Sequence, residues 1–428
     1  MPCMHFSPAL IMALVLAAWP ARAQAPVALD AAILRYTPAI TVLRHQLHRN
    51  PELGNREVQT AAVIATHLRG LGLEVRAGIA HTGVIGILRG GKPGPVVAVR
   101  ADMDALPVTE NTGLSFASAV RTQYGGQEVG VMHACGHDIH VAVGLGTASV
   151  LAGMKADIAG TVVFIFQPAE EGPPPGEQGG AKLMLEQGTF KNPVPKAIFA
   201  LHSSPELQVG EFGITSGPFM AAADEWSARI IGRQSHGAHP HQSVDPVVMA
   251  SQVVLALQTI RSRNMSPIDD GVVTVAIIRG GERENIIPGE VHLAGTVRTF
   301  DPKVQDMIER RMREIMGGIT QAGGGSFEMT YDRNYPVTVN DPDLTTRMSP
   351  TLARVGKLRT LPPTTGAEDF SFFAQQVPGF YFRLGTTKPG TSSGGLHTPT
   401  YNGDDSAIPV GVRAMSALVI DYLSAGVR

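Results

Sequence analysis

The feature that most constrains the fold is a series of buried apolar strands alternating with helices, interrupted once near residue 222. The segments VVAVRAD (96–102), GTVVFIFQPAEEG (160–172) and AIFALH (197–202) are largely apolar before their last residues, as in strands covered on both faces. Helical periodicity occupies residues 38–49 and 56–71, and a helical pattern of small residues follows His140. These patterns predict an α/β/α domain.

A second pattern, strand–helix–strand–strand–helix–strand, occupies the interruption. Strands are expected at DEWSARIIGR (224–233), GVVTVAIIRGG (271–281), GEVHLAGTVRTF (289–300) and SFEMTYDR (326–333), with helices over 246–263 and 303–322. This order is that of a ferredoxin-like α+β unit of about 110 residues. Because the α/β pattern returns near residue 335, we expect an inserted domain at 218–332, with 24–217 and 333–428 forming the α/β domain.

The N-terminus predicts export. The apolar run ALIMALVLAAWP (9–20) precedes Ala21-Arg22-Ala23, a small-residue cleavage signal, and it is too short to span a bilayer. Residues 1–23 are therefore predicted to be a signal peptide. The mature chain is expected to be periplasmic or secreted, with no membrane association after cleavage. The formal net charge of −2 gives no electrostatic footprint for nucleic acid or an anionic membrane.

Cleavage of the signal peptide would remove Cys3 and leave Cys135 as the one cysteine of the mature chain. A single thiol has no intramolecular disulfide partner in an oxidising compartment. Cys135 is therefore an inert buried side chain, a nucleophile or a metal ligand.

Acidic residues and histidines stand where the buried strands are expected to end. They are Asp102, Asp104, Glu170, Glu171 and His202. Open α/β sheets bind ligands at the carboxyl ends of their strands, so these side chains should converge. Cys135 and His137 in MHACGHDIH (132–140) and His397 in GGLHTPTYNGDD (394–405) add a thiol and two imidazoles. Such groups are ligands of zinc, manganese or cobalt, and one of two adjacent glutamates can hold metal while the other acts as a base.

These motifs together resemble a known family. Eight motifs occur in order over nearly the whole mature chain. They are RADMDALP (100–107), MHACGHDIH, QPAEEG (167–172), ALH (200–202), SHGAHPHQSVDPV (235–247), NIIPGEVHLAGTVRT (285–299), GAEDFSFF (366–373) and GGLHTPTYNGDD. They are similar to the amidohydrolase branch of the M20 metallopeptidases, which includes hippurate hydrolases, N-acyl-amino-acid amidohydrolases and auxin-conjugate hydrolases. The resemblance implies a metal-binding α/β domain interrupted by a smaller dimerisation, or lid, domain, and a homodimer or larger homo-oligomer.

The resemblance also implies a site with two divalent metal ions per subunit, of Zn, Mn or Co. The implied ligands are Cys135, His137, Glu171, His202 and His397. Glu170 would be the general base, and Asp104 would orient a ligand histidine. Asp102 occupies the position of a metal-binding histidine in the broader peptidase group.

Residues of the inserted domain would complete the site. A donor for the developing oxyanion is expected from His236, often across the dimer in this family, although His239 and His241 leave the choice open. The resemblance implies that Asn285 touches the substrate. Arg298 is either a partner of the amino-acid carboxylate or part of a structural ion pair.

The implied reaction is hydrolysis of the amide bond of an N-acyl amino acid, with an aromatic acyl group, by metal-activated water. A metallo-exopeptidase of the same family, a carboxypeptidase or dipeptidase acting on short peptides, is the alternative. A thiol hydrolase using Cys135 with His137 and a non-catalytic metal- or solute-binding protein are further alternatives. Two departures from the family pattern, the Pro/Gly-rich loop 171–180 and GRQSHGAHPH (232–241), could alter the preferred acyl group.

Overall fold

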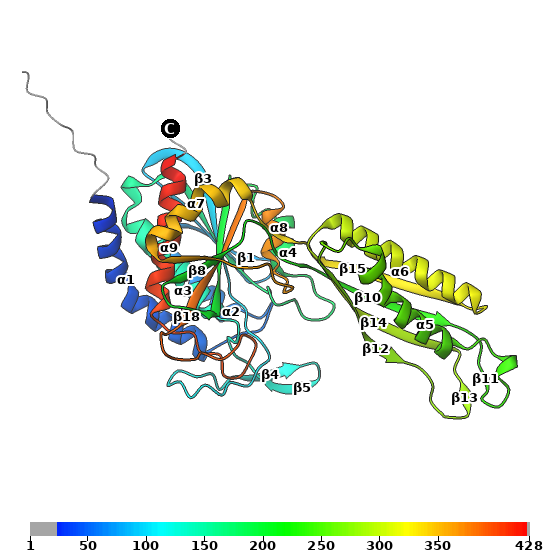
Figure 1. Cartoon of the computed structure of the whole chain (residues 1–428). Helices are drawn as coiled ribbons and strands as arrows, with labels where there is room; N and C mark the ends of the chain where they lie inside the picture. The colour runs from blue at the N-terminus through cyan, green and yellow to red at the C-terminus, as the bar shows by residue number, and fades with distance from the viewer. Residues whose placement is uncertain (1–23, 426–428) are drawn as a thin grey trace, which may run out of the picture.

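The computed structural model describes residues 24–425, which form an α/β domain and an elongated inserted domain that projects from it (Figure 1). The predicted signal peptide lies outside these residues. The α/β domain is built on an eight-stranded sheet in the order β1-β2-β6-β3-β7-β18-β8-β17. Its strands are β1 (Glu74–Ile79), β2 (Gly83–Arg89), β3 (Lys92–Asp102), β6 (Ala159–Gln167), β7 (Ile198–Gln208), β8 (Glu211–Ile214), β17 (Lys357–Thr360) and β18 (Gly379–Thr387).

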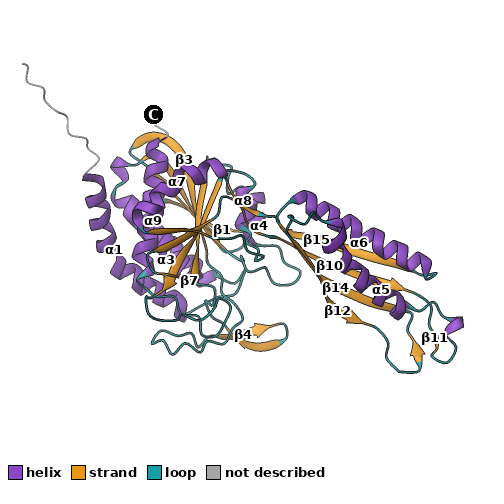
Figure 2. Ribbon diagram, in the orientation of Figure 1, coloured by secondary structure: helices purple, strands orange, loops and turns teal. Residues whose placement is uncertain are grey.

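The centre of this sheet is parallel, because β6, β3, β7 and β18 all run in the same direction. One face carries α1 (Gln24–Arg49), α2 (Val58–Gly70), α3 (His137–Gly153), α7 (Pro342–Val355) and α9 (Ala407–Ala425), and the other carries α4 (Gly180–Glu186) and α8 (Phe370–Ala374) (Figure 2). Successive residues of β6 show why the sequence is continuously apolar. Val162 and Phe164 contribute to the first core, whereas Val163 and Ile165 contribute to the second.

Helix α9 has the length and apolar composition of a membrane span. It packs against α1, α3 and α7 in the first core, with Leu418 and Val419 fully buried. Its apolar character is therefore explained by its place inside the α/β domain.

The inserted domain, called the lid below, comprises β10 (Ala222–Ile231), α5 (Pro246–Thr259), β12 (Gly271–Arg279), β14 (Glu290–Thr299), α6 (Pro302–Ala322) and β15 (Ser326–Tyr335). Its sheet has the order β12-β14-β10-β15 with every pair antiparallel, which is the ferredoxin-like arrangement. Asp245 and Asp301 cap α5 and α6 through their carboxylates, and a proline follows each cap. The lid has its own core, with Trp226, Leu293 and Ile308 buried between sheet and helices.

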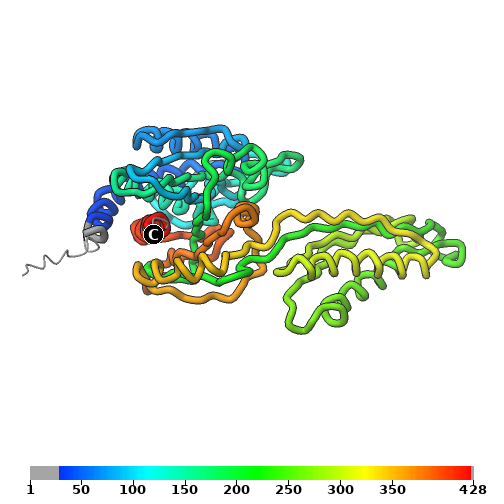
Figure 3. The backbone as a smooth tube through the Cα atoms, turned by 90° about the horizontal axis from the view of Figure 1, so that it is seen from above, coloured from blue at the N-terminus to red at the C-terminus, as the bar shows by residue number. Residues whose placement is uncertain are grey.

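The chain enters and leaves the lid side by side. Strand β9 (Gly217–Met220) precedes the lid and pairs antiparallel with β16 (Thr338–Asn340), which follows it. Seen from above, the strands that continue from them, β10 and β15, run side by side along the lid (Figure 3). The predicted fold class, an α/β/α domain interrupted by a ferredoxin-like insert, is confirmed.

Several element boundaries differ from the sequence prediction. Helix α1 begins at Gln24, ahead of the predicted start at residue 38. Helix α5 ends at Thr259 and passes into a π-helical turn, Ile260–Asn264. Strand β7 continues past His202 to Gln208, because it stays paired with β18 after its pairing with β3 has ended. The remaining strands form two short pairs: β4 (Arg121–Tyr124) and β5 (Gln127–Gly130) make a hairpin, and β11 (Ser235–His236) pairs with β13 (Ile286–Ile287) from a separate loop of the lid.

Candidate metal centre

The candidate centre lies at the carboxyl end of the parallel strands, where the N-terminus of α3 meets β7. Gly136 caps α3 with a φ of 83°, between Cys135 and His137. A Cβ at this position would lie 2.4 Å from the Ser203 hydroxyl oxygen, so the close approach requires glycine. This tight junction brings the start of α3 against the strand that carries His202.

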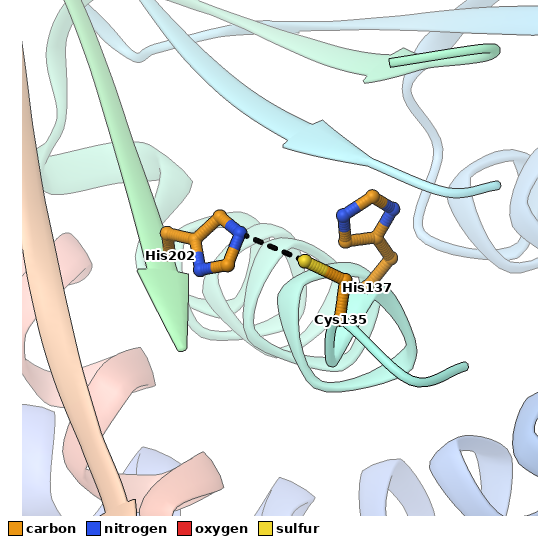
Figure 4. Close-up of side chains that lie close together, drawn as sticks. All are labelled: Cys135, His137 and His202. Atoms are coloured by element: carbon orange, nitrogen blue, oxygen red, sulfur yellow. Dashed lines mark hydrogen bonds between the residues drawn. The ribbon is translucent and has the colours of Figure 1, made fainter. Parts of the chain in front are cut away.

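The five predicted ligands lie together. Cys135 Sγ is 3.2 Å from His202 Nε2 (Figure 4) and 3.2 Å from His397 Nε2. Glu171 Oε1 lies 3.1 Å from His397 Nε2 and 3.9 Å from His137 Nε2. Cys135, His137 and His202 form one group with metal-binding spacing, and Cys135, Glu171 and His397 form another. The cysteine is common to both groups.

His137 and His202 turn their Nε2 atoms into this cluster. Asp104 Oδ1 lies 3.1 Å from His137 Nδ1, and His137 Nε2 is buried with no hydrogen-bond partner. His202 Nδ1 donates to the Ser203 carbonyl at 2.7 Å, so its Nε2 is free to act as a ligand. A buried ring nitrogen without a partner is costly unless something binds it, and a cation fits the surrounding donors.

The electrostatics of the cluster favour a cation. Burial opposes protonation of His137, but the negative charges of Asp102 and Asp104 raise its pKa to about 10. Burial raises the pKa of Glu170 well above its ordinary value, and the nearby Glu368 carboxylate adds to the effect. A divalent ion would relieve the repulsion among these carboxylates.

Cys135 does not have the surroundings of a thiol nucleophile. Burial raises the pKa of its thiol, and Glu171 and Glu170 add negative charge that opposes ionisation further. Its ring contacts are to His202 and His397, whereas the thiol-hydrolase alternative paired it with His137. The arrangement favours a thiolate formed by metal binding.

The carboxylate of Asp102 is hydrogen-bonded to His140 and Arg100, neither of which is a predicted metal ligand. The carboxylate lies 2.5 Å from His140 Nδ1 and accepts a hydrogen bond from Arg100 at 2.5 Å. His140 Nε2 in turn accepts from the Ser203 backbone N–H at 2.7 Å. Both nitrogens of His140 are therefore occupied, so this buried histidine supports the site without offering a lone pair.

Two buried residues that the sequence reasoning missed hold the loops of the site. Arg100 donates to Gln167, Asp102, Glu368 and Asp369 at 2.5–3.1 Å. A single arginine inside the apolar run VVAVRAD was the available signal, because a buried guanidinium needs several acceptors.

Glu57 is the second missed residue. It accepts from the Thr82 hydroxyl at 2.6 Å and from the Ala169 backbone N–H at 2.8 Å. Ala169 has a φ of 50°, which turns the chain just before Glu170 and Glu171. Nothing in the sequence around Glu57 marked it, because its partners lie 25 and 112 residues away.

Two adjoining cavities open at the cluster. One, of about 390 Å³, is lined by four of the five predicted ligands, all except His137, together with Met220, Leu396 and Arg383. The other, of about 810 Å³, lies between loop 172–180 and the root of the lid, where Arg298 lines it. They share Glu171, Tyr335 and Ala367. Within residues 24–425, Arg298 forms no ion pair, so the structural pairing considered for it is absent there.

The remaining predicted residues lie elsewhere. His236 and Asn285 are on the loops of β11 and β13, at the end of the lid far from the α/β domain (Figure 1). They lie close to each other, since the Gly237 N–H donates to the Asn285 carbonyl at 2.8 Å. His239 and His241 are exposed in the same loop. One chain alone does not bring these side chains to the metal-ligand cluster.

The α/β/α fold, the lid and this donor set define a metal-dependent hydrolase. Residues 98–421 match peptidase family M20/M25/M40, and the chain belongs to this family. The resemblance seen in the sequence motifs is thereby confirmed, as is hydrolysis of amide bonds as the class of reaction.

Named relatives span the whole domain arrangement. Thermostable carboxypeptidase 2 of Saccharolobus solfataricus is 38% identical over 388 residues, which cover 90% of this chain and 95% of the relative. N-acetylcysteine deacetylase of Bacillus subtilis is 36% identical over 383 residues, covering 89% and 96%. The crystal structure of the Bacillus subtilis YXEP protein, described as a dinuclear metal-binding peptidase of the M20 family, superposes with a TM-score of 0.78 at 33% identity, covering 91% and 99%. Deacetylases and carboxypeptidases are both among the relatives, so the family does not by itself choose the substrate.

The two histidines of α3 give a matched test of the ligand set. His137→Gln should lose bound metal after dialysis, because its unpartnered Nε2 is removed. His140→Gln should keep the metal stoichiometry, since both of its ring nitrogens already have protein partners. Metal content would be measured by elemental analysis, with folding checked by circular dichroism. Equal metal loss in both variants would show that His137 has no special role as a ligand.

Proposed function

We propose that this protein hydrolyses the amide bond of N-acyl amino acids, with an aromatic acyl group, to a carboxylic acid and a free amino acid. The observation that carries the proposal is Glu170. Its carboxyl group is buried beside the ligand cluster, 3.9 Å from His137 Nε2, and it lines the smaller cavity with the apolar side chains of Met220 and Leu396. A buried carboxylate that lies beside the ligands and in the wall of a cavity suits proton transfer during amide hydrolysis.

The proposed cofactor is a pair of divalent ions, Zn, Mn or Co, held by Cys135, His137, Glu171, His202 and His397. When bound, the ions would supply Lewis-acid polarisation of the carbonyl and lower the pKa of water from 15.7 towards about 7. Asp104 supports this set twice. It orients His137 through Nδ1, and its other oxygen accepts the Glu171 backbone N–H at 3.0 Å.

Glu170 would take a proton from the attacking water and give it to the leaving amine. The two glutamates have different jobs because they have different surroundings. Glu171 contacts His397, whereas Glu170 lies against the Glu368 and Asp369 side of the cavity. Burial raises the pKa of the Glu170 carboxyl, which makes its carboxylate a stronger base for a proton of water.

His236 is the proposed oxyanion donor, supplied by a partner subunit in a homodimer. The Ala238 N–H donates to His236 Nδ1 at 3.1 Å, so the ring proton resides on the exposed Nε2, where it can be donated. This feature favours His236 over His239 and His241, and Asn285 on the neighbouring loop is proposed to contact the substrate. Arg298, at the root of the lid, is proposed to bind the amino-acid carboxylate.

The lid also supports self-association. Strand β12 is an edge strand of the lid sheet, and it exposes Val272 and Ile278. Helix α5 exposes Val247, Val248 and Leu255. Unpaired edge strands and exposed apolar side chains favour pairing with a second copy, and a homodimer or larger homo-oligomer is proposed.

Export is the proposed location. The signal peptide predicted at residues 1–23, from its apolar run and the Ala21-Arg22-Ala23 cleavage signal, would direct the chain to the periplasm or the exterior.

A metallo-exopeptidase acting on short peptides is the second candidate function. The larger cavity favours it, because its length between loop 172–180 and the lid could accept an extended chain, and Arg298, Arg333 and Lys182 line it. A relative named as a carboxypeptidase supports the same reading.

A release assay separates the two functions. The metal-loaded protein should release amino acid from N-benzoyl and N-acetyl amino acids at least about tenfold more efficiently, in kcat/KM, than from dipeptides with the same C-terminal residue, because Met220 and Leu396 offer the acyl group apolar contacts in the smaller cavity. Zn, Mn and Co would each be added back after chelation. A preference for dipeptides would replace the amidohydrolase with the exopeptidase.

The roles of Glu170 and Glu171 can be separated by isosteric variants. Glu170→Gln should lower kcat by about 10²–10⁴-fold with metal content and KM nearly unchanged, because a general base contributes to the transition state. Glu171→Gln should lose metal, and excess metal should partly restore its activity. An active Glu170→Gln protein would contradict the mechanism, and the reverse pattern would exchange the two roles.

Complementation between subunits tests the position of His236. A purified heterodimer of Glu170→Gln and His236→Ala chains should regain about half of the wild-type activity, since one of its two sites has both residues intact if the histidine acts across the dimer. A heterodimer of Glu170→Gln with Glu171→Gln is the control and should be inactive. If the first heterodimer is inactive while His236→Ala homodimers are impaired, the histidine acts within its own subunit.

A further inference from the structure

Arg383 is a cation in the wall of the smaller cavity. It lies on β18 in register with His202 on the neighbouring strand β7. The cavity of about 390 Å³ that contains the ligand cluster is lined by Arg383 as well as by Met220 and Leu396. Its side chain is partly buried, so its guanidinium is only incompletely hydrated.

This guanidinium has no carboxylate partner within residues 24–425. Its carbon lies 5.5 Å from the centre of the Tyr381 ring and 5.7 Å from that of Phe219, and one of its nitrogens lies 3.2 Å from the sulfur of Met220. Aromatic faces and a thioether do not neutralise an arginine or satisfy its five N–H groups.

The guanidinium of Arg100, which is also buried near the site, is neutralised by carboxylates of the chain. Arg100 contacts the carboxylates of Asp102, Glu368 and Asp369. Glu368 also lines the smaller cavity, but its two oxygens are taken by Arg100 and by the Tyr381 hydroxyl. An anion for Arg383 is therefore expected from outside the chain.

We propose that Arg383 binds a carboxylate of the substrate inside the smaller cavity and thereby determines specificity. This inference rests on the proposed function, in that the substrate amide is taken to lie at the ligand cluster beside Glu170. A planar guanidinium can hold a carboxylate through two parallel hydrogen bonds, which suits recognition of one end of a small acid.

The carboxylate could come from either end of an N-acyl amino acid. The adjoining larger cavity offers Arg298 for one end, and the two cavities meet at Glu171 and Tyr335. If Arg298 holds the amino-acid carboxylate, Arg383 holds an acidic acyl group, and the substrate carries a carboxylate at each end. If Arg383 holds the amino-acid carboxylate, the acyl group enters the larger cavity.

Three matched compounds distinguish these sources. N-pentanoyl-L-phenylalanine is compared with N-glutaryl-L-phenylalanine, which adds a carboxylate to an acyl chain of the same length. N-pentanoyl-L-phenylalanine is also compared with N-pentanoyl-L-phenylalanine amide, which lacks the amino-acid carboxylate. In one of the two comparisons, the compound with the additional carboxylate should have a kcat/KM about 10- to 100-fold higher in the wild type, the range expected of a charged hydrogen-bonded pair. Arg383→Gln should abolish that advantage and leave the compound without it nearly unchanged.

Arg347→Gln is the control variant. Arg347 lies on the exposed surface of α7 with its guanidinium 4.5 Å from the centre of the Tyr422 ring, so it matches the aromatic contact of Arg383 away from the cavities. It should behave as wild type with all three compounds. If Arg383→Gln lowers all three rates equally, or changes none of them, the proposal is wrong.

Binding separates this inference from the proposed function. The three compounds would be titrated by calorimetry into metal-loaded Glu170→Gln protein and into the Glu170→Gln, Arg383→Gln double variant. A carboxylate-dependent affinity that disappears with Arg383 supports the anchor even if the wild type hydrolyses none of the compounds, an outcome that would defeat the proposed function alone. No carboxylate-dependent affinity in the Glu170→Gln protein would overturn the anchor.

Discussion

The site depends on one buried ion cluster, in which Arg100 holds together three segments of the chain. Its guanidinium contacts Asp102 at the end of β3, Gln167 at the end of β6, and Glu368 and Asp369 before α8. Removing one partner from such a cluster leaves a buried charge unpaired, at a cost of about 3–5 kcal/mol. The cluster therefore fixes the carboxyl ends of the central strands relative to one another before any metal binds.

The same cluster positions the ligand side chains. Asp102 is hydrogen-bonded to His140, and His140 accepts a hydrogen bond from the backbone N–H of Ser203, next to His202. Glu57 accepts the Ala169 N–H and so holds the left-handed turn immediately before Glu170 and Glu171. The ligands thus stand on a frame that is already hydrogen-bonded, as preorganised sites require.

The sequence predicted the fold class and the inserted domain, and physical reasons explain which features it did not predict. Period-2 and apolar patterns located the strands, and the change of pattern at the insert located the lid, because burial on one or both faces is a local property of the sequence. The five predicted ligand residues were supplied by the resemblance to the M20 motifs, and two of them, Glu171 and His202, also stand where strands were expected to end. The contacts of Arg100, Glu57 and His140 were not predicted, because they join residues up to 269 positions apart and no local pattern encodes them. The end of β7 was misplaced for the same reason, since its extension depends on pairing with β18.

The position of the cysteine follows from the charge of this frame. Asp102, Asp104, Glu170 and Glu171 already place several negative charges beside the start of α3, so a further carboxylate there would add to their repulsion in the absence of metal. A thiol at Cys135 stays neutral under these conditions, because burial raises its pKa. It can still ionise when a cation arrives, since coordination stabilises the thiolate. Cys135 also lies 3.2 Å from both His202 and His397, at the shared corner of the two candidate ligand groups. Because Cys135 is neutral without metal and anionic with it, the residue adds no charge repulsion to the metal-free protein and is a strong ligand when metal binds.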